Sequence, residues 1–110
     1  MNIKFTARHF RPRAAVRQHA MDEVRRLGKF YDGIVSAEII LSYERAVHSV
    51  KKAEINLAVY GGLLSAKERS DDYAKSIDLA CAKLSQRLKK YKSKLREKDK
   101  TKVRTARAKV

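Results

Sequence analysis

Three segments of the chain alternate apolar and polar residues, which predicts three β-strands. The alternation is clearest in residues 2–8 and returns in residues 34–44 and 53–60, and residues 63–69 should form a fourth strand that returns from a turn. In the second segment, the residues expected to face a core are Val35, Ala37, Ile39, Leu41 and Tyr43. Gly61 and Gly62 separate the last two segments. Glycines accept the positive φ of a tight turn, so these two strands should form a hairpin.

Two longer segments repeat apolar residues every three or four positions, which predicts two amphipathic helices. The first repeat is Val16, Ala20, Val24, Leu27 and Tyr31, and the second is Ile77, Cys81, Leu84, Leu88, Tyr91 and Leu95. Pro12 suits the first turn of helix one, which should end within residues 28–32. Residues 70–72, Ser-Asp-Asp, should cap helix two and place acids near its positive end.

The predicted order is therefore β-α-β-β-β-α. The first two strands should be parallel, because a helix connects them, and the last three should form an antiparallel meander. Each strand has one apolar face, so both helices should cover the same side of a four-stranded mixed sheet. This is a two-layer α+β fold. No apolar face continues beyond Arg96, so we expect an ordered domain over residues 1–96 and a basic, disordered tail over residues 97–110.

The charge of the chain narrows its possible partners. Its formal net charge is +15, of which +11 falls between Lys83 and Val110. Such an excess is typical of proteins that bind nucleic acid or an anionic membrane. No run of about 18 apolar residues predicts a membrane span, and the N-terminus lacks the apolar core of a signal peptide. We therefore expect a soluble, cytoplasmic protein.

Four cations of helix two should form one continuous row, which we call the basic ridge: Lys83, Arg87, Lys90 and Lys94. At 1.5 Å per residue the row is roughly 16 Å long, and few acids lie near it in the sequence. A solvated helix face normally mixes charges of both signs, so the ridge favours a polyanion as partner. The opposite face is needed to cover the sheet, which argues against membrane binding. No DNA-reading motif is present, and a basic sheet-and-helix surface favours RNA.

Candidate catalytic groups are weak. Cys81 lies on the apolar stripe of helix two and is expected in the core; as the only cysteine it cannot form an intrachain disulfide. The histidines, His9, His19 and His48, have no metal-ligand spacing. Asp71 and Asp72 suit a helix start better than a catalytic pair, and no glycine-rich phosphate loop precedes a helix. We expect no enzyme, no cofactor, no metal and no small-molecule substrate.

Four motifs occur in an order that resembles one known family. They are "MNIKFTARHF", "LGKFYDGI", "AEINLAVYGGLLSA" and "SDDYAKSIDLACAKLSQRLKKYKSKL", which together cover roughly residues 1–95. The chain resembles the ribosome hibernation promoting factors, also called ribosome-associated inhibitors or sigma-54 modulation proteins, in their short form. Relatives usually carry Met-Tyr after the Asp-Asp pair, whereas this chain has Tyr73 and Ala74.

The resemblance implies a bacterial protein that binds the small ribosomal subunit, and the 70S ribosome, during stress or stationary phase. Members of the family lie between head and body of that subunit, against 16S rRNA, and exclude mRNA and tRNA. Their basic helix faces contact rRNA, which points to the basic ridge. Lys29 at the end of helix one and Arg8 on the first strand are weaker candidates.

Two other function classes stay open from the residues alone. A general structured-RNA-binding or ribosome-assembly protein would bind naked duplex RNA as well as it binds assembled subunits. A small enzyme would need a pocket lined by His9, Cys81 or the Asp71–Asp72 pair. The sequence does not determine whether the protein promotes or prevents ribosome dimers. Nor does it determine whether the tail is ordered on the ribosome, or whether the free protein self-associates.

Overall fold

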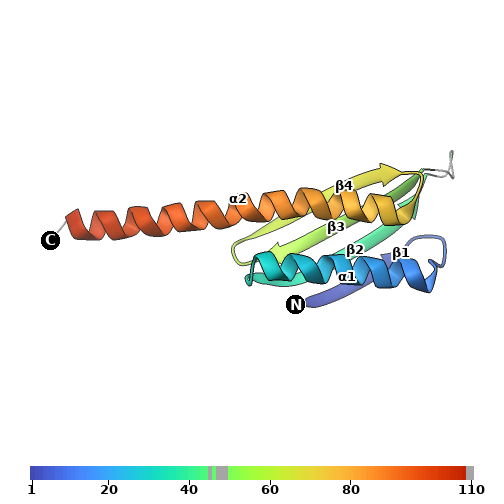
Figure 1. Ribbon diagram of the computed structural model, residues 1–110, viewed down its shortest axis with the longest axis horizontal. Helices are drawn as coiled ribbons and strands as arrows, with labels where there is room; N and C mark the ends of the chain where they lie inside the picture. The colour runs from blue at the N-terminus through green and yellow to red at the C-terminus, as the bar shows by residue number, and fades with distance from the viewer. Residues whose placement is uncertain (45, 47–49, 109–110) are drawn as a thin grey trace.

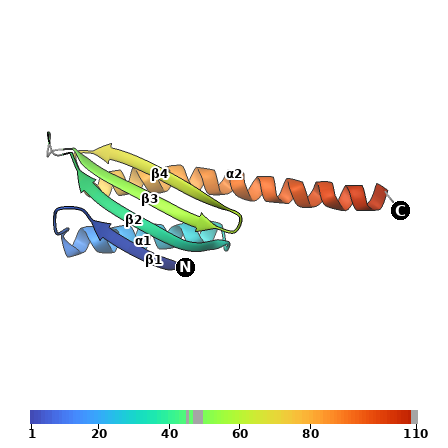
Figure 2. The same ribbon diagram turned by 180° about the vertical axis from the view of Figure 1, so that it is seen from behind.

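A computed structural model describes the chain except residues 45, 47–49 and 109–110, with side chains described as far as Lys94. The elements are β1 (Asn2–Ala7), α1 (Ala14–Phe30), β2 (Ile34–Tyr43), β3 (Lys51–Val59), β4 (Gly62–Ser70) and α2 (Tyr73–Ala108). The sheet order is β1-β2-β3-β4, with β1 parallel to β2 and the other pairs antiparallel. Both helices cover one face of the sheet (Figure 1), and the other face is open (Figure 2). The predicted α+β fold and its element order are confirmed.

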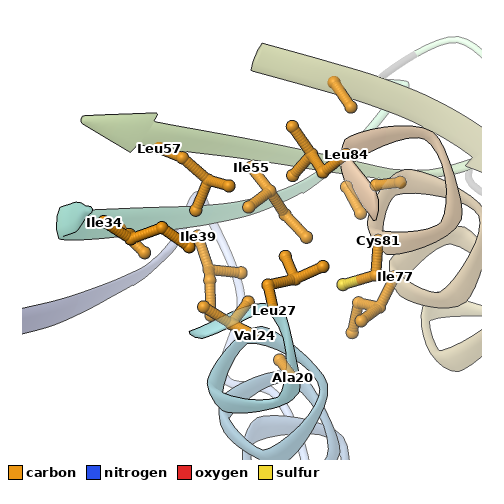
Figure 3. Close-up of a cluster of buried hydrophobic side chains, with 14 of the residues drawn as sticks. Ala20, Val24, Leu27, Ile34, Ile39, Ile55, Leu57, Ile77, Cys81 and Leu84 are labelled. Carbon is orange, nitrogen blue, oxygen red and sulfur yellow. The ribbon is translucent and has the colours of Figure 1, made fainter. Parts of the chain in front are cut away.

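The core lies between the sheet and the two helices. Ala20, Val24 and Leu27 of α1 face the sheet beside Ile77, Cys81 and Leu84 of α2 (Figure 3). The sheet contributes Ile39 and Leu41 from β2 and Ile55 and Leu57 from β3, all fully buried. Burying one such side chain contributes about 1.5–3 kcal/mol, so this layer fixes how α2 lies on the sheet.

Hydrogen bonds fix the beginning of α2. Asp72 Oδ2 accepts the backbone N–H of Lys75 at 3.4 Å, and Ser70 Oγ accepts that of Asp72 at 3.2 Å. Ser76 is fully buried, and its hydroxyl donates to the carbonyl oxygen of Lys51 at 2.8 Å. The predicted cap is confirmed, and the Ser76 hydroxyl ties the first turn of α2 to β3.

Two local predictions are wrong. Val35 was expected to face the core, but it is 62% exposed while Ile34 is buried. The pairing of β2 with β3 shifts register between Ile34 and Ser36, which leaves one extra residue in β2. An extra residue in one strand turns the side chains before it to the other face of the sheet. Pro12 lies before α1 and not in its first turn, because the helix begins at Ala14.

The helix α2 is longer than predicted. It continues to Ala108 and projects beyond the sheet (Figures 1 and 2), whereas a disordered tail was expected from Glu97. Residues 73–108 contain no glycine or proline and many good helix formers, so no local signal ends the helix at residue 96. The functional division of the chain after residue 96 stays a prediction.

Candidate nucleic-acid interface

The basic ridge lies outside the buried stripe of α2, on the side of the helix next to β4. Ile77, Leu84 and Leu88 form the buried stripe of this helix. The four ridge residues, Lys83, Arg87, Lys90 and Lys94, are all exposed. The sequence spacing therefore separated the two faces of α2 correctly. Because the buried stripe is packed against β3 and β4, the ridge is carried on a helix that cannot rotate freely.

Three of the ridge cations are available to bind an anion. Arg87, Lys90 and Lys94 form no ion pair with any side chain that the structure describes. By the rise of an α-helix they extend over roughly 10 Å, a distance that covers two to three phosphates of a nucleic-acid strand. Unpaired like charges on one helix face repel each other, so a polyanion that neutralised them would be bound favourably.

Lys83 differs from the other ridge residues. Its ammonium group forms an ion pair with Oε1 of Glu68 on β4, so the expectation that few acids lie near the ridge is wrong at this position. Only 18% of the Glu68 side chain is exposed, so the Lys83 ammonium group supplies the charge that this poorly solvated carboxylate needs. Glu68 follows Ala66 on the helix-facing side of β4. A carboxylate at a core-facing strand position was the available signal, because such a group needs a cation nearby. Lys83 therefore has a structural partner before any ligand binds.

Lys29 lies on the α1 side of α2, whereas the basic ridge lies on the β4 side, and Arg8 is not near the ridge either. Lys29 is exposed in the last turn of α1, and the next residue, Phe30, has the ammonium group of Lys89 5.7 Å from its ring centre. The end of α1 therefore lies beside the middle of α2. Arg8 is also exposed, but it follows β1, the edge strand opposite β4, at the end of the sheet where α2 begins. The structure does not bring Arg8 together with the basic ridge.

The open face of the sheet carries a different charge pattern. Four of its cations each lie near a glutamate: Lys4–Glu38 at 3.9 Å, Lys67–Glu54 at 3.9 Å, Lys52–Glu44 at 3.7 Å and Arg69–Glu44 at 2.9 Å. The charges of this face are therefore nearly balanced by cross-strand neighbours. A polyanion would have to compete with these glutamates here, which makes the helix layer the better candidate interface.

The candidate catalytic groups do not form an active site. Cys81 is 6% exposed, and its burial, with smaller contributions from Glu23 and Asp78, raises the pKa of the thiol to about 12. It is a protonated core residue at neutral pH and not a nucleophile. A hollow of about 580 Å³ lies on the open face, and its lining includes Asn2, Lys4, Glu38 and Leu63. Cys81, His9 and the Asp71–Asp72 pair do not line it. No helix among the described residues is long and apolar enough to cross a membrane.

Tyr73, the tyrosine displaced by one position, has a packing role. Its ring stacks on Phe10 with the ring centres 4.9 Å apart, and the ammonium group of Lys51 lies 5.6 Å from its centre. Burial, and then the neighbouring Tyr43, raises the pKa of the Tyr73 hydroxyl. The ring therefore joins the start of α2 to the segment after β1, away from the basic ridge.

Comparison with known proteins agrees with this fold. The family model described as "Sigma 54 modulation protein / S30EA ribosomal protein" matches residues 3–96. The ribosome hibernation promotion factor of Staphylococcus aureus (strain COL) is 26% identical over 84 residues, which are 76% of this chain and 44% of that relative. The chain thus corresponds to less than half the length of this curated relative.

Two solved structures are similar over most of the chain. A ribosomal subunit interface protein from Coxiella burnetii has 28% identity and a TM-score of 0.76, and the match covers 84% of this chain and 99% of the other. The N-terminal domain of Thermus thermophilus Protein Y has 29% identity and a TM-score of 0.71, with 83% and 99% covered. The similarity in both cases includes sequence as well as fold.

Proposed function

The chain belongs to the family of sigma 54 modulation proteins and S30EA ribosomal proteins, and on this basis we propose that it binds the small ribosomal subunit through 16S rRNA. One observation carries the proposal. Arg87, Lys90 and Lys94 are exposed in a row on a helix whose other face is fixed to the sheet, and no described side chain neutralises them. Such a row can contact the phosphates of structured RNA without reading bases, because phosphate contacts depend on shape and charge.

The proposed mechanism is occlusion without any chemical step. The domain over residues 1–96 would lie in the decoding channel between head and body of the subunit and occupy the space of mRNA and tRNA. Translation would stop, and ribosomes would enter hibernation during stress or stationary phase. The names of the similar proteins support this: one is a ribosome hibernation promotion factor, and another is a ribosomal subunit interface protein. A ribosome-bound protein of this kind works in the bacterial cytoplasm.

The helical segment after residue 96 would add to binding. It carries further cations and continues the axis of α2 beyond the sheet. If the whole protein engages about four to eight phosphates, its affinity should fall by roughly two to four powers of ten between about 50 and 200 mM salt. Lys29 would contribute from the end of α1, and Lys83 would contribute less, because Glu68 already neutralises part of its charge.

Co-sedimentation with purified ribosomal particles tests the proposal. The protein is mixed with 30S, 50S or 70S particles across a salt series, with structured duplex RNA in excess as competitor and labelled mRNA and tRNA as displaced ligands. We expect binding to 30S and 70S particles that survives the competitor and releases mRNA and tRNA. Equal binding to any duplex RNA would contradict the proposal and favour a general structured-RNA-binding or ribosome-assembly protein.

A further inference from the structure

Three metal-binding side chains converge between the two helices, away from the basic ridge. His19 and Glu23 lie one turn apart on α1, and Asp78 lies on the facing side of α2. One donor atom from each of the three residues lies within 4.8 Å of the others. His19 Nε2 and Asp78 Oδ1 are 2.6 Å apart. The spacing of the histidines in the sequence predicts no metal site, but the fold joins His19 and Asp78, which are 59 positions apart.

From this geometry we propose that His19, Glu23 and Asp78 bind a divalent transition-metal ion such as Zn²⁺. One imidazole nitrogen and two carboxylate oxygens form a ligand set that suits Zn²⁺, and water would complete the coordination. The imidazole disfavours Ca²⁺ and Mg²⁺, which prefer oxygen ligands only. Ligands of a tetrahedral ion lie about 3–3.5 Å apart at the usual bond lengths, so His19 Nε2 and Asp78 Oδ1 would separate slightly to admit an ion, and the Glu23 carboxylate would move toward them.

The position of Glu23 distinguishes a metal site from a simple ion pair. A histidine–aspartate contact between two helices requires no second carboxylate. Yet the Glu23 side chain is only 21% exposed, and it lies in the same cluster. Arg26 Nη1 is 3.0 Å from Glu23 Oε1, so Arg26 neutralises part of the negative charge of the cluster. The other carboxylate oxygen of Glu23 stays available to coordinate a metal ion. A divalent cation would neutralise both carboxylates at once.

Cys81 lies one turn after Asp78 but is not one of the proposed ligands. Its sulfur points into the core between α1 and α2 (Figure 3), whereas the side chains of His19 and Asp78 are partly exposed, by 34% and 55%. The proposed ligand set therefore contains nitrogen and oxygen only. An ion bound there would link α1 to α2 and stabilise the helix layer by binding the folded state alone. This inference does not depend on the proposed ribosomal function.

Titration of the metal-free full chain with Zn²⁺ tests the site, by calorimetry and by thermal unfolding. We expect a single saturable site and a higher unfolding temperature with Zn²⁺. His19→Asn, Glu23→Gln and Asp78→Asn should each weaken binding by about tenfold or more, since each removes one ligand. Circular dichroism of each metal-free variant verifies that it is folded. His9→Asn is the matched control: His9 is exposed outside the cluster with a φ of +66°, which asparagine tolerates, and this variant should bind like the wild type.

Either of two results would overturn the proposal. One is the absence of saturable Zn²⁺ binding to the folded wild type, and the other is unchanged affinity in folded His19→Asn and Asp78→Asn variants. The absorption spectrum of the Co²⁺-substituted protein adds a test of the ligand set. A thiolate-to-cobalt band would identify Cys81 as a ligand and contradict a site made of nitrogen and oxygen donors.

Discussion

The open face of the sheet and the helix layer both carry many cations, but among the described side chains only the helix layer leaves a row of cations unpaired. On the open face, Lys4 and Lys67 lie within 3.9 Å of glutamates on the neighbouring strands. On α2, the exposed Arg87, Lys90 and Lys94 have no acidic partner among the described side chains. The net charge of +15 therefore does not locate an anion site by itself. The pairing of the cations distinguishes the two faces.

The difference has a local cause. Neighbouring strands place side chains about 5 Å apart on the same face, so a lysine opposite a glutamate pairs with it across the ladder. On a helix, the neighbours of an exposed residue lie three or four positions away. For Arg87 these positions hold Lys83, Leu84, Lys90 and Tyr91, none of which is acidic. Among the described side chains, Lys83 is the ridge cation that has an acidic partner, because β4 supplies Glu68.

Removal of the unpaired cations should have the largest effect on binding. The triple variant Arg87→Gln, Lys90→Gln and Lys94→Gln should bind 30S particles about 100-fold more weakly, at about 1 kcal/mol for each lost charged contact. Filter binding at fixed salt measures the effect. The matched control on the open face is Lys4→Gln, Lys67→Gln and Arg69→Gln, which changes the net charge equally and should alter affinity by less than about threefold. Equal losses in both variants would remove the distinction between the two faces.

A substitution on the other face of α2 should lower stability without removing any ridge cation. Leu84 is fully buried, so Leu84→Ala should lower the free energy of unfolding by about 2–5 kcal/mol. Urea denaturation measures this, and 30S affinity should be unchanged under conditions in which the variant is folded. Gln86→Ala, at an exposed position of the same helix, is the control and should change stability by less than about 0.5 kcal/mol. A stable Leu84→Ala variant would contradict the packing described for α2.

Lys83 should behave as a structural residue more than its ridge neighbours do. Lys83→Glu should lower the free energy of unfolding by about 1–2 kcal/mol, because it places a second carboxylate beside the poorly exposed Glu68. The double variant Lys83→Glu, Glu68→Lys should recover part of this loss. Urea denaturation of both variants, with Lys90→Glu as the exposed control, measures the difference. Equal stability of Lys83→Glu and Lys90→Glu would show that the pair has no structural role.

Single substitutions on the open face should have the smallest effect. Lys67→Gln removes one exposed ion pair with Glu54 and should change the free energy of unfolding by less than about 0.5 kcal/mol. Its affinity for 30S particles should match that of the wild type. A loss of binding from this single change would place the open face in the interface and reverse the comparison.

Periodicity predicted the elements and the buried stripe of α2, and the connections between successive elements predicted the strand directions and the layers. Contacts between distant elements left no such pattern. Glu68 and Lys83 lie on different elements, as do His19 and Asp78, and only the packing of α2 brings them together. The exposed Val35 results from a register shift against β3, which alternation within β2 cannot reveal.

The dependence of 30S affinity on salt tests the central claim most directly. Each phosphate neutralised by a cation contributes about 0.7–0.9 to the slope of log affinity against log salt. The slope should therefore become shallower by about 2 in the triple variant of Arg87, Lys90 and Lys94. The open-face triple variant should keep the wild-type slope. If the helix variant kept the wild-type slope as well, these three cations would not contact phosphates, and the basic ridge would not be the ribosome-binding surface.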